Sequence, residues 1–196
     1  MKAVMLSVSE TLLEERRKRG ADRWDEMWEG VLHMPPPPSW GHQGIVTKLG
    51  GFLDSECDRR SLGTVVTQAG LYDEDELDSD YRVPDVVFVS KSRLRLIQDR
   101  GVVGAADAVI EVRSPDDETY EKFPFFARLG VRQVIVIDAR TRKPEVYLLA
   151  GKGYAAVAPD SEGWLVAGIL GVRFRWISKR RLRVEAIDNP KIGIEL

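Results

Sequence analysis

The chain has 196 residues, a length typical of one domain, and its 43% hydrophobic and 31% charged residues exclude wholesale disorder. A net charge of −2 excludes a general polyanion binder, so any nucleic-acid contact must come from local charge. The single cysteine, Cys57, excludes an internal disulfide and a cysteine-based zinc site. No apolar run reaches the roughly 18–20 residues of a membrane span, and the start lacks the apolar stretch of a signal peptide, so we expect a cytoplasmic protein without a membrane partner.

The first elements alternate between charged and apolar segments. Residues 9–19 predict a short helix with Leu12 and Leu13 among charges, and WEGVLHM, residues 28–34, predicts a strand. The proline run that follows, residues 35–39, cannot donate ladder hydrogen bonds, so the sheet must stop there. We interpret the run as a stiff extended connector, with a recognition motif for SH3-like partners as the alternative.

A long helix is expected from His42 to Arg60, because apolar residues recur there at helical spacing. Gly50 and Gly51 weaken the helix and allow close packing. Short strands are expected at 64–68 and 70–72, followed by an acidic loop, 73–80, whose simplest interpretation is a solvated turn. It would repel nucleic acid if it lay near the binding groove.

Three runs rich in β-branched residues, at 82–90, 108–114 and 131–138, predict buried core strands. A helix is expected between the last two, over 116–130, with acidic residues at its start and Pro124 kinking or restarting it.

The remainder predicts a hairpin around the turn at 151–153 and strand-like, basic segments over 164–184. The sum is one domain, 1–196, of α/β or α+β class, with a mixed sheet and helices packed on it.

The strand at 108–114 carries the first chemical signal. Side chains alternate along a strand, so Asp107, Glu111 and Arg113 share one face while Ile110 and Val112 face the core. A carboxylate within such an apolar strand is costly to bury as an ion unless a partner compensates it.

Asp85 presents the same anomaly at the start of the strand VVFV. If the two strands are neighbours, Asp85 and Glu111 converge and repel each other, and a bound divalent cation is one natural remedy. Carboxylate oxygens suit Mg²⁺ or Mn²⁺, with water completing the coordination.

These residues carry a resemblance. Pro84-Asp85 followed by Glu111-Val112-Arg113 on two core strands resembles the PD-(D/E)XK nuclease core. More closely, the segments WEGVLHMPPPPSWGHQ, YRVPDVVFV, EVRSP, ETYEK and LGVRQVIVID are similar to the bacterial Uma-two family, described as restriction endonucleases. The likeness covers roughly 22–150, leaving an N-terminal helix in 1–21 and C-terminal strands with a basic segment in 151–196.

The resemblance implies a restriction-endonuclease-like core, a mixed central sheet flanked by helices, that hydrolyses DNA with Mg²⁺ or Mn²⁺ and forms a homodimer. It implies Asp85 and Glu111 as metal ligands, with the Val112 carbonyl as a third oxygen. Arg113 stands where the motif has lysine; it can stabilise transition-state charge but cannot act as a base. Lys122 matches the lysine that the family places on the next helix.

Two further candidates follow from the same likeness. Glu29 matches the acid before the family's strand and could ligate metal or water, and His42 could contact a phosphate or shuttle a proton. The alternatives are a helix-start or capping role for these two, and a surface ion pair between Glu118 and Lys122. His33, in an apolar strand, is expected to have a core role.

The basic stretch at 172–183 allows two interpretations. Its cations could neutralise phosphates while Trp176 stacks on a base. Alternatively, it is an edge strand that charge protects from aggregation.

Two other functional classes remain beside the nuclease. The first is an inactive scaffold that serves dimerisation or nucleic-acid binding, which Arg113 in the lysine position favours. The second, a hydrolase or transferase of a small phosphate compound, lacks support because the sequence has no Gly-rich phosphate loop; a Ser-His-Asp enzyme lacks its GxSxG motif.

Overall fold

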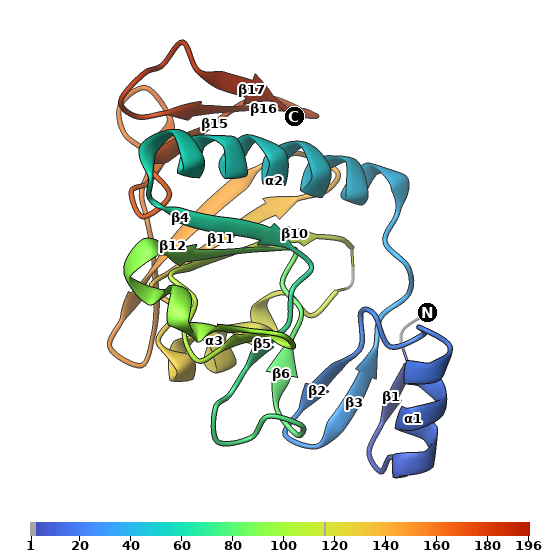
Figure 1. Cartoon of the computed structure of the whole chain (residues 1–196). Coiled ribbons are helices and arrows are strands. Elements are labelled where there is room, and N and C mark those ends of the chain that lie inside the picture. The colour runs from blue at the N-terminus through green and yellow to red at the C-terminus, as the bar shows by residue number, and fades with distance from the viewer. Residues whose placement is uncertain (1–2, 116) are drawn as a thin grey trace.

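The computed structural model describes residues 3–115 and 117–196 and contains three sheets, with helices packed between and around them (Figure 1). The central sheet has the order β13-β12-β11-β10-β7-β4, and it is mixed, because β10 and β11 are parallel while its other pairs are antiparallel. This confirms the predicted fold class. In that order its strands are Gly153–Ala156, Pro144–Ala150, Gln133–Asp138, Ala108–Arg113, Val86–Ser90 and Gly63–Thr67.

The other two sheets flank this core. A seven-stranded sheet of short strands, with the order β1-β3-β2-β6-β5-β9-β8, consists of Ala3–Met5, Val31–Met34, Glu26–Trp28, Tyr81–Arg82, Leu71–Tyr72, Gly101–Val103 and Ile97–Gln98. A four-stranded sheet consists of β14 to β17, Trp164–Ala167, Val172–Ser178, Arg181–Ala186 and Gly193–Glu195. The helices are α1 Glu10–Lys18, α2 Trp40–Arg60, α3 Phe123–Leu129 and the 3-10 turns η1 Lys91–Leu96 and η2 Tyr120–Lys122.

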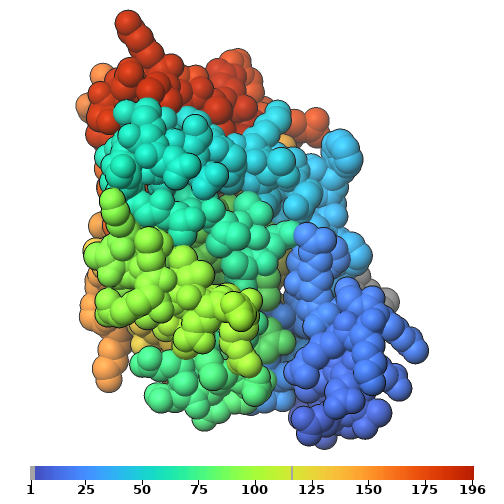
Figure 2. Space-filling view, viewed as in Figure 1, coloured from blue at the N-terminus to red at the C-terminus, as the bar shows by residue number. Residues whose placement is uncertain are grey.

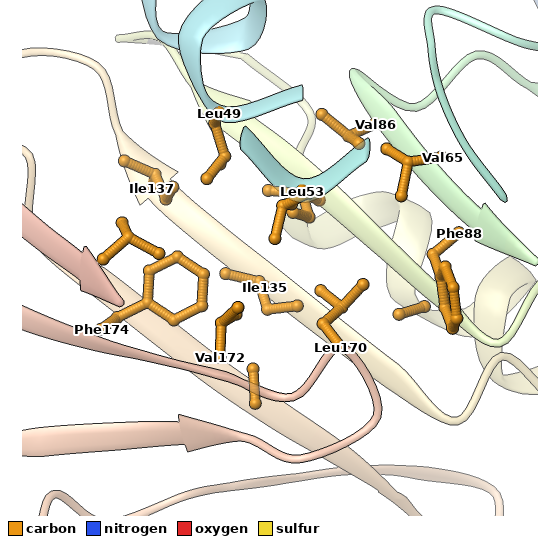
Figure 3. Close-up of a cluster of buried hydrophobic side chains, with 14 of the residues drawn as sticks. Leu49, Leu53, Val65, Val86, Phe88, Ile135, Ile137, Leu170, Val172 and Phe174 are labelled. Atoms are coloured by element: carbon orange, nitrogen blue, oxygen red, sulfur yellow. The ribbon is translucent and has the colours of Figure 1, made fainter. Parts of the chain in front are cut away.

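The predicted long helix is α2, which begins at an N-cap where Ser39 Oγ accepts from the His42 N–H. In Figure 1 this helix crosses one face of the central sheet and separates it from the C-terminal strands β15–β17. Its buried Leu49 and Leu53 pack with Ile135 of β11 and Phe174 of β15 in one cluster (Figure 3). The C-terminal strands therefore share the core of the central sheet.

Gly50 allows α2 to approach β4 closely, as the sequence predicted. A Cβ added at Gly50 would lie 2.6 Å from Cγ2 of Thr67, whereas one at Gly51 would meet nothing within 4 Å.

We therefore expect Gly51→Ala to stabilise the protein by about 0.5–1 kcal/mol through helix propensity. Gly50→Ala should be less stable than Gly51→Ala by about 1–3 kcal/mol, because the added methyl overpacks the contact with β4. Urea unfolding measures both. Adding Thr67→Ser to Gly50→Ala removes the clashing methyl and should recover most of the loss; no recovery would refute the steric explanation.

The strand expected at 28–34 is wrong, because this segment is part of a hairpin. Strands β2 and β3 pair antiparallel, and the turn between them is formed by Glu29 and Gly30, which have φ of 49° and 83°. Two consecutive residues with positive φ make the tight turn whose twist matches that of paired strands. The turn reverses the chain between Trp28 and Val31.

The helix expected over 116–130 begins outside the described residues at Asp116, and it is shorter than predicted. The chain forms η2 first, and α3 then starts at Phe123 with Pro124 in its opening turn. Proline lacks the N–H that a helix interior requires, so it fits only this first turn, which confirms the predicted restart.

The other predicted elements are confirmed within one to four residues, namely α1, β4, β5, β7, β10, β11 and the hairpin β12–β13. Strands β1, β8 and β9 and the turn η1 were not predicted; each strand has at most three residues. Within the described ranges, no helix combines the length and apolarity that crossing a bilayer requires.

Candidate active site

Asp85 and Glu111 lie on neighbouring strands, as the sequence analysis expected. Strand β7 pairs antiparallel with β10, with Val86 opposite Ile110, so continuing this register by one residue places Asp85 opposite Glu111. Glu111 is 4% exposed in the middle of β10. The Asp85 carboxylate accepts a hydrogen bond from the Val112 N–H at 2.7 Å, which fixes its position against β10.

Lys122 brings a buried cation to this pair. Its Nζ lies 3.3 Å from each carboxylate oxygen of Glu111 and 2.8 Å from Oε1 of Glu26. Burial lowers the pKa of Lys122, but attraction to Glu111 and Glu26 outweighs burial and raises that pKa above its ordinary value. Lys122 is therefore a permanent positive charge between two carboxylates.

Glu26 is the site residue that the sequence analysis missed. It opens β2, is 5% exposed, and contacts Lys122 through Oε1. The same oxygen accepts from the Val83 N–H at 2.9 Å, and Oε2 accepts from Nε1 of Trp28 at 2.9 Å. Three donors thus hold this carboxylate in one orientation, facing Glu111 across Lys122.

A stack of flat groups supports Glu26 from behind. The guanidinium of Arg82 lies 4.2 Å from the ring centre of Trp28 and 4.3 Å from that of Phe125, and Trp28 is also stacked on His33 at 4.3 Å. Arg82 also donates to Asp80 and to the Met27 carbonyl, each at 2.7 Å. The stack locks the indole whose N–H orients Glu26.

Both histidines line the site. His42, in the first turn of α2, has Nε2 3.2 Å from the Asp85 carboxylate. Its Nδ1 is buried and meets no hydrogen-bond partner among the described residues. His33 has Nδ1 2.9 Å from Glu118 and lines the pocket; it is half-buried and lies outside both apolar clusters, so the expected core role is wrong.

Glu29 and Arg113 lie outside this cluster. Glu29 lies in the tight turn between β2 and β3 and is exposed. The acid that this hairpin contributes to the pocket is therefore Glu26. Arg113 shares a strand face with Glu111, but its guanidinium donates to Asp138 at 2.7 Å and lies over Tyr120. Asp138 is its register partner on β11, which draws Arg113 away from the pocket.

The cluster lies in a pocket of about 600 Å³, which Glu26, Asp85, Glu111, Lys122 and both histidines help to line. The proline connector forms part of the pocket wall, through Pro35, Pro36, Pro37 and Pro38. A stiff wall of this kind supports the interpretation of the prolines as a spacer.

The electrostatics of the pocket are unbalanced. Burial raises the pKa of Glu111 well above its ordinary value, the charges of Asp85 and Glu26 raise it further, and Lys122 only partly offsets them. Three carboxylates share one ammonium, so the site lacks positive charge when all are ionised.

The donor set fits a hard divalent cation in its chemistry. Asp85, Glu111 and Glu26 offer carboxylate oxygens, and Mg²⁺ commonly takes one or two carboxylates with water in the remaining positions. No group of three or more acids, histidines or cysteines within residues 3–115 and 117–196 is arranged to hold an ion, since Lys122 stands between Glu26 and Glu111. A cation would therefore bind on the side of Asp85 and Glu111.

Comparisons with known proteins identify the family and the fold. The profile of the Uma2 family, described as "Putative restriction endonuclease", matches residues 13–180. The fold is similar to a crystal structure from Anabaena variabilis described as a "putative nuclease belonging to DUF820", with a TM-score of 0.59, 18% identity, and coverage of 74% of this chain and 83% of that one. At that identity the likeness shows the fold alone. No curated protein matches the sequence.

Proposed function

The chain belongs to the Uma2 family of restriction-endonuclease-like proteins, and we propose that it is a nuclease that hydrolyses DNA phosphodiester bonds with a divalent cation, Mg²⁺ or Mn²⁺. The observation that carries the proposal is the convergence of Glu26, Asp85, Glu111 and Lys122 at one buried point of a pocket. Asp85 and Glu111 are the proposed ligands, with the Val112 carbonyl as an additional oxygen.

Hydrolysis joins a water oxygen to phosphorus, breaks the bond to one ester oxygen, and leaves that oxygen with a proton. A bound divalent cation would lower the pKa of water and neutralise phosphate charge. The Lys122 ammonium can donate to a phosphate oxygen and stabilise the charge that develops there. Glu26 holds this ammonium in place, and His42, beside Asp85, can donate to a phosphate oxygen or accept a proton.

Lys122 rather than Arg113 takes the role of the motif lysine in this proposal. Its Nζ contacts Glu111 directly, whereas the Arg113 guanidinium is held by Asp138 on the next strand. Arg113 stays outside the proposed chemistry and fixes the carboxyl ends of β10 and β11 to each other.

An inactive scaffold is the second candidate. The observation in its favour is that Lys122 already pairs with Glu26 and Glu111, so the buried acids have a partner without a cation. Cation binding separates the two functions, because a scaffold has no need of it. The homodimer remains a prediction, which sedimentation at several concentrations would check.

The test compares wild type with Asp85→Ala by calorimetric titration of Mg²⁺ and Mn²⁺, with supercoiled plasmid incubated in parallel. We expect Asp85→Ala to lose measurable cation binding and at least about 10²-fold in nicking rate, since it removes a ligand from the position that orients the reaction. Glu29→Ala, which removes an exposed acid from the neighbouring hairpin, is the matched control and should behave as wild type. Folded wild-type protein that binds neither cation would favour the scaffold.

A further inference from the structure

Three of the six cations in the basic stretch at 172–183 pair with acids of their own sheet. Arg173 lies 2.7 Å and Arg183 3.2 Å from Glu185, and Arg181 lies 2.9 Å from Glu195. The expectation of an edge strand is wrong, because β15 pairs with both β14 and β16, and these ion pairs join neighbouring strands of the sheet. Arg175 lies over the ring of Trp164, and Lys179 and Arg180 of the β15–β16 turn are exposed and have no carboxylate partner among the described residues.

That turn joins a second basic turn, which links β11 to β12. The Arg180 N–H and Nε1 of Trp176 both donate to the Thr141 carbonyl, at 3.2 Å and 3.0 Å. Arg140 and Lys143 are exposed on either side of Thr141. Two turns distant in sequence therefore place four exposed cations together.

The first half of α2 extends this surface. Lys48 and Trp40 line a hollow of about 490 Å³ together with Arg142 of the second turn and Leu196. Trp40 is 95% exposed, which is unusual for the largest apolar side chain. Figure 2 shows the beginning of α2, in light blue, on the surface beside the C-terminal residues in red.

We call this surface the basic ledge, defined by Lys48, Arg140, Lys143, Lys179, Arg180 and Trp40. Within residues 3–115 and 117–196, none of its five cations lies within 4.0 Å of a carboxylate. The acidic loop lies elsewhere, where Asp73 and Asp80 pair with Arg128 beside α3. The ledge therefore presents uncompensated positive charge on a protein whose net charge is −2.

Two elements, β11 and α2, connect the basic ledge to the candidate active site. Glu111 pairs with Val136 of β11, and the basic turn begins directly after Asp138, so the turn lies about 10–15 Å from Glu111 at ordinary strand spacings. In the first turn of α2, His42 lines the active-site pocket while Trp40 lines the hollow of the ledge.

We infer that the basic ledge holds the phosphate backbone of the nucleic acid whose scissile bond enters the pocket. This inference rests on the proposed function. A nucleic-acid strand carries one phosphate per about 3.4 Å of duplex axis, so the distance from the pocket to the ledge spans three or four phosphates. Trp40 supplies a flat apolar face on which an unpaired base or a sugar can lie.

The test measures binding of a short labelled duplex and the corresponding single strand by fluorescence anisotropy in EDTA, where no cleavage interferes. The ledge variant carries Lys48→Gln, Arg140→Gln, Lys143→Gln and Lys179→Gln. The matched control carries Lys91→Gln, Arg95→Gln, Lys152→Gln and Lys191→Gln. These four cations are also exposed, and they follow the far ends of β7, β12 and β16, away from the pocket.

Both variants lose the same charge, so only its position differs. We expect the ledge variant to bind at least tenfold more weakly and its log–log salt dependence to become shallower by about 2–4, whereas the control changes less than twofold. Trp40→Ala should weaken single-strand binding by about five- to tenfold.

Equal losses of nucleic-acid affinity in the two variants, or no loss in either, would refute the proposed role of the basic ledge. So would wild type that does not bind, or a dimer that Trp40→Ala dissociates while nucleic-acid binding stays unchanged, since the surface would then fit a second copy of the chain. Because binding is read without cleavage, wild type that binds through the ledge but never nicks plasmid refutes the proposed nuclease and leaves the ledge intact.

Discussion

Glu111→Gln is expected to abolish nicking while making the metal-free protein more stable. The substitution removes a proposed cation ligand, so the nicking rate should fall by at least about 10³-fold and cation binding should become undetectable. It also removes a charge that burial and the neighbouring acids disfavour. We expect the Tm in EDTA at pH 8 to rise by about 2–4 °C, the change that about 1 kcal/mol produces in a chain of this length.

The gain should depend on pH in a defined direction. The pKa of Glu111 is raised in the folded protein above its ordinary value of 4.5, so folding favours the protonated acid. Wild type therefore loses stability as pH rises through the raised pKa, whereas the glutamine variant has no such loss. The difference in Tm should be largest in alkaline buffer and vanish below about pH 4.5, where the acid is protonated in both states.

Thermal unfolding of both proteins in EDTA across this pH range measures the effect. Glu29→Gln is the control, because its exposed carboxylate in the hairpin turn should change neither the Tm nor the nicking rate. Equal nicking by wild type and Glu111→Gln would remove Glu111 from the site. A Tm that falls at alkaline pH would show that the ion pair with Lys122 outweighs the burial of the acid.

The two central acids could be predicted because each breaks a strong local pattern. Asp85 and Glu111 are carboxylates at apolar strands, and the chemistry of burial alone marks them as unusual. The two acids meet if their strands are neighbours, and β7 does pair with β10. Local pattern therefore sufficed for the centre of the site.

Glu26 was missed because the hairpin was taken for a single strand. The signal was present in the two residues Glu29-Gly30 between the apolar segments EMW and VLHM, since glycine in such a pair favours a tight turn. Recognising the turn would have made Glu26 and Trp28 face the same side of a paired strand. The resemblance instead pointed to Glu29, three positions away and in the turn itself.

Arg113 and the basic stretch show what local pattern cannot provide. The alternation of side chains correctly places Arg113 on the same strand face as Glu111. The direction of the Arg113 guanidinium, however, depends on its ion pair with Asp138, which lies 25 residues later and is opposite Arg113 in the parallel register. Likewise, the acids that neutralise Arg173 and Arg181 are Glu185 and Glu195 on neighbouring strands. Both outcomes depend on tertiary register, which a single sequence does not specify.

Arg82→Leu is expected to produce the largest loss of stability of any substitution outside the apolar core. Arg82 has a side-chain exposure of 5%, and its Nη1 donates to Asp80, whose side chain is 4% exposed. Leucine removes the buried partner of Asp80 and leaves it the half-exposed Arg128, and we expect this loss to cost about 3–5 kcal/mol. The leucine also ends the stack on Trp28 and Phe125, so the indole that donates to Glu26 loses its support.

Urea unfolding and cation titration below the unfolding transition separate these two consequences. We expect Arg82→Leu to lower the free energy of unfolding by about 3–5 kcal/mol. We expect it to lower cation affinity by about 10–100-fold, because Trp28 orients Glu26, and Glu26 holds Lys122 beside the proposed ligand Glu111. Arg128→Leu is the matched control: Arg128 contacts the same Asp80 and Phe125, but its side chain is 44% exposed, so its ion pair should contribute only about 0–1 kcal/mol.

Equal losses of unfolding free energy in the two variants would show that contact with Asp80 matters and burial does not. Unchanged cation affinity in Arg82→Leu would separate the stack from the site and leave Glu26 held by Lys122 and the Val83 N–H alone.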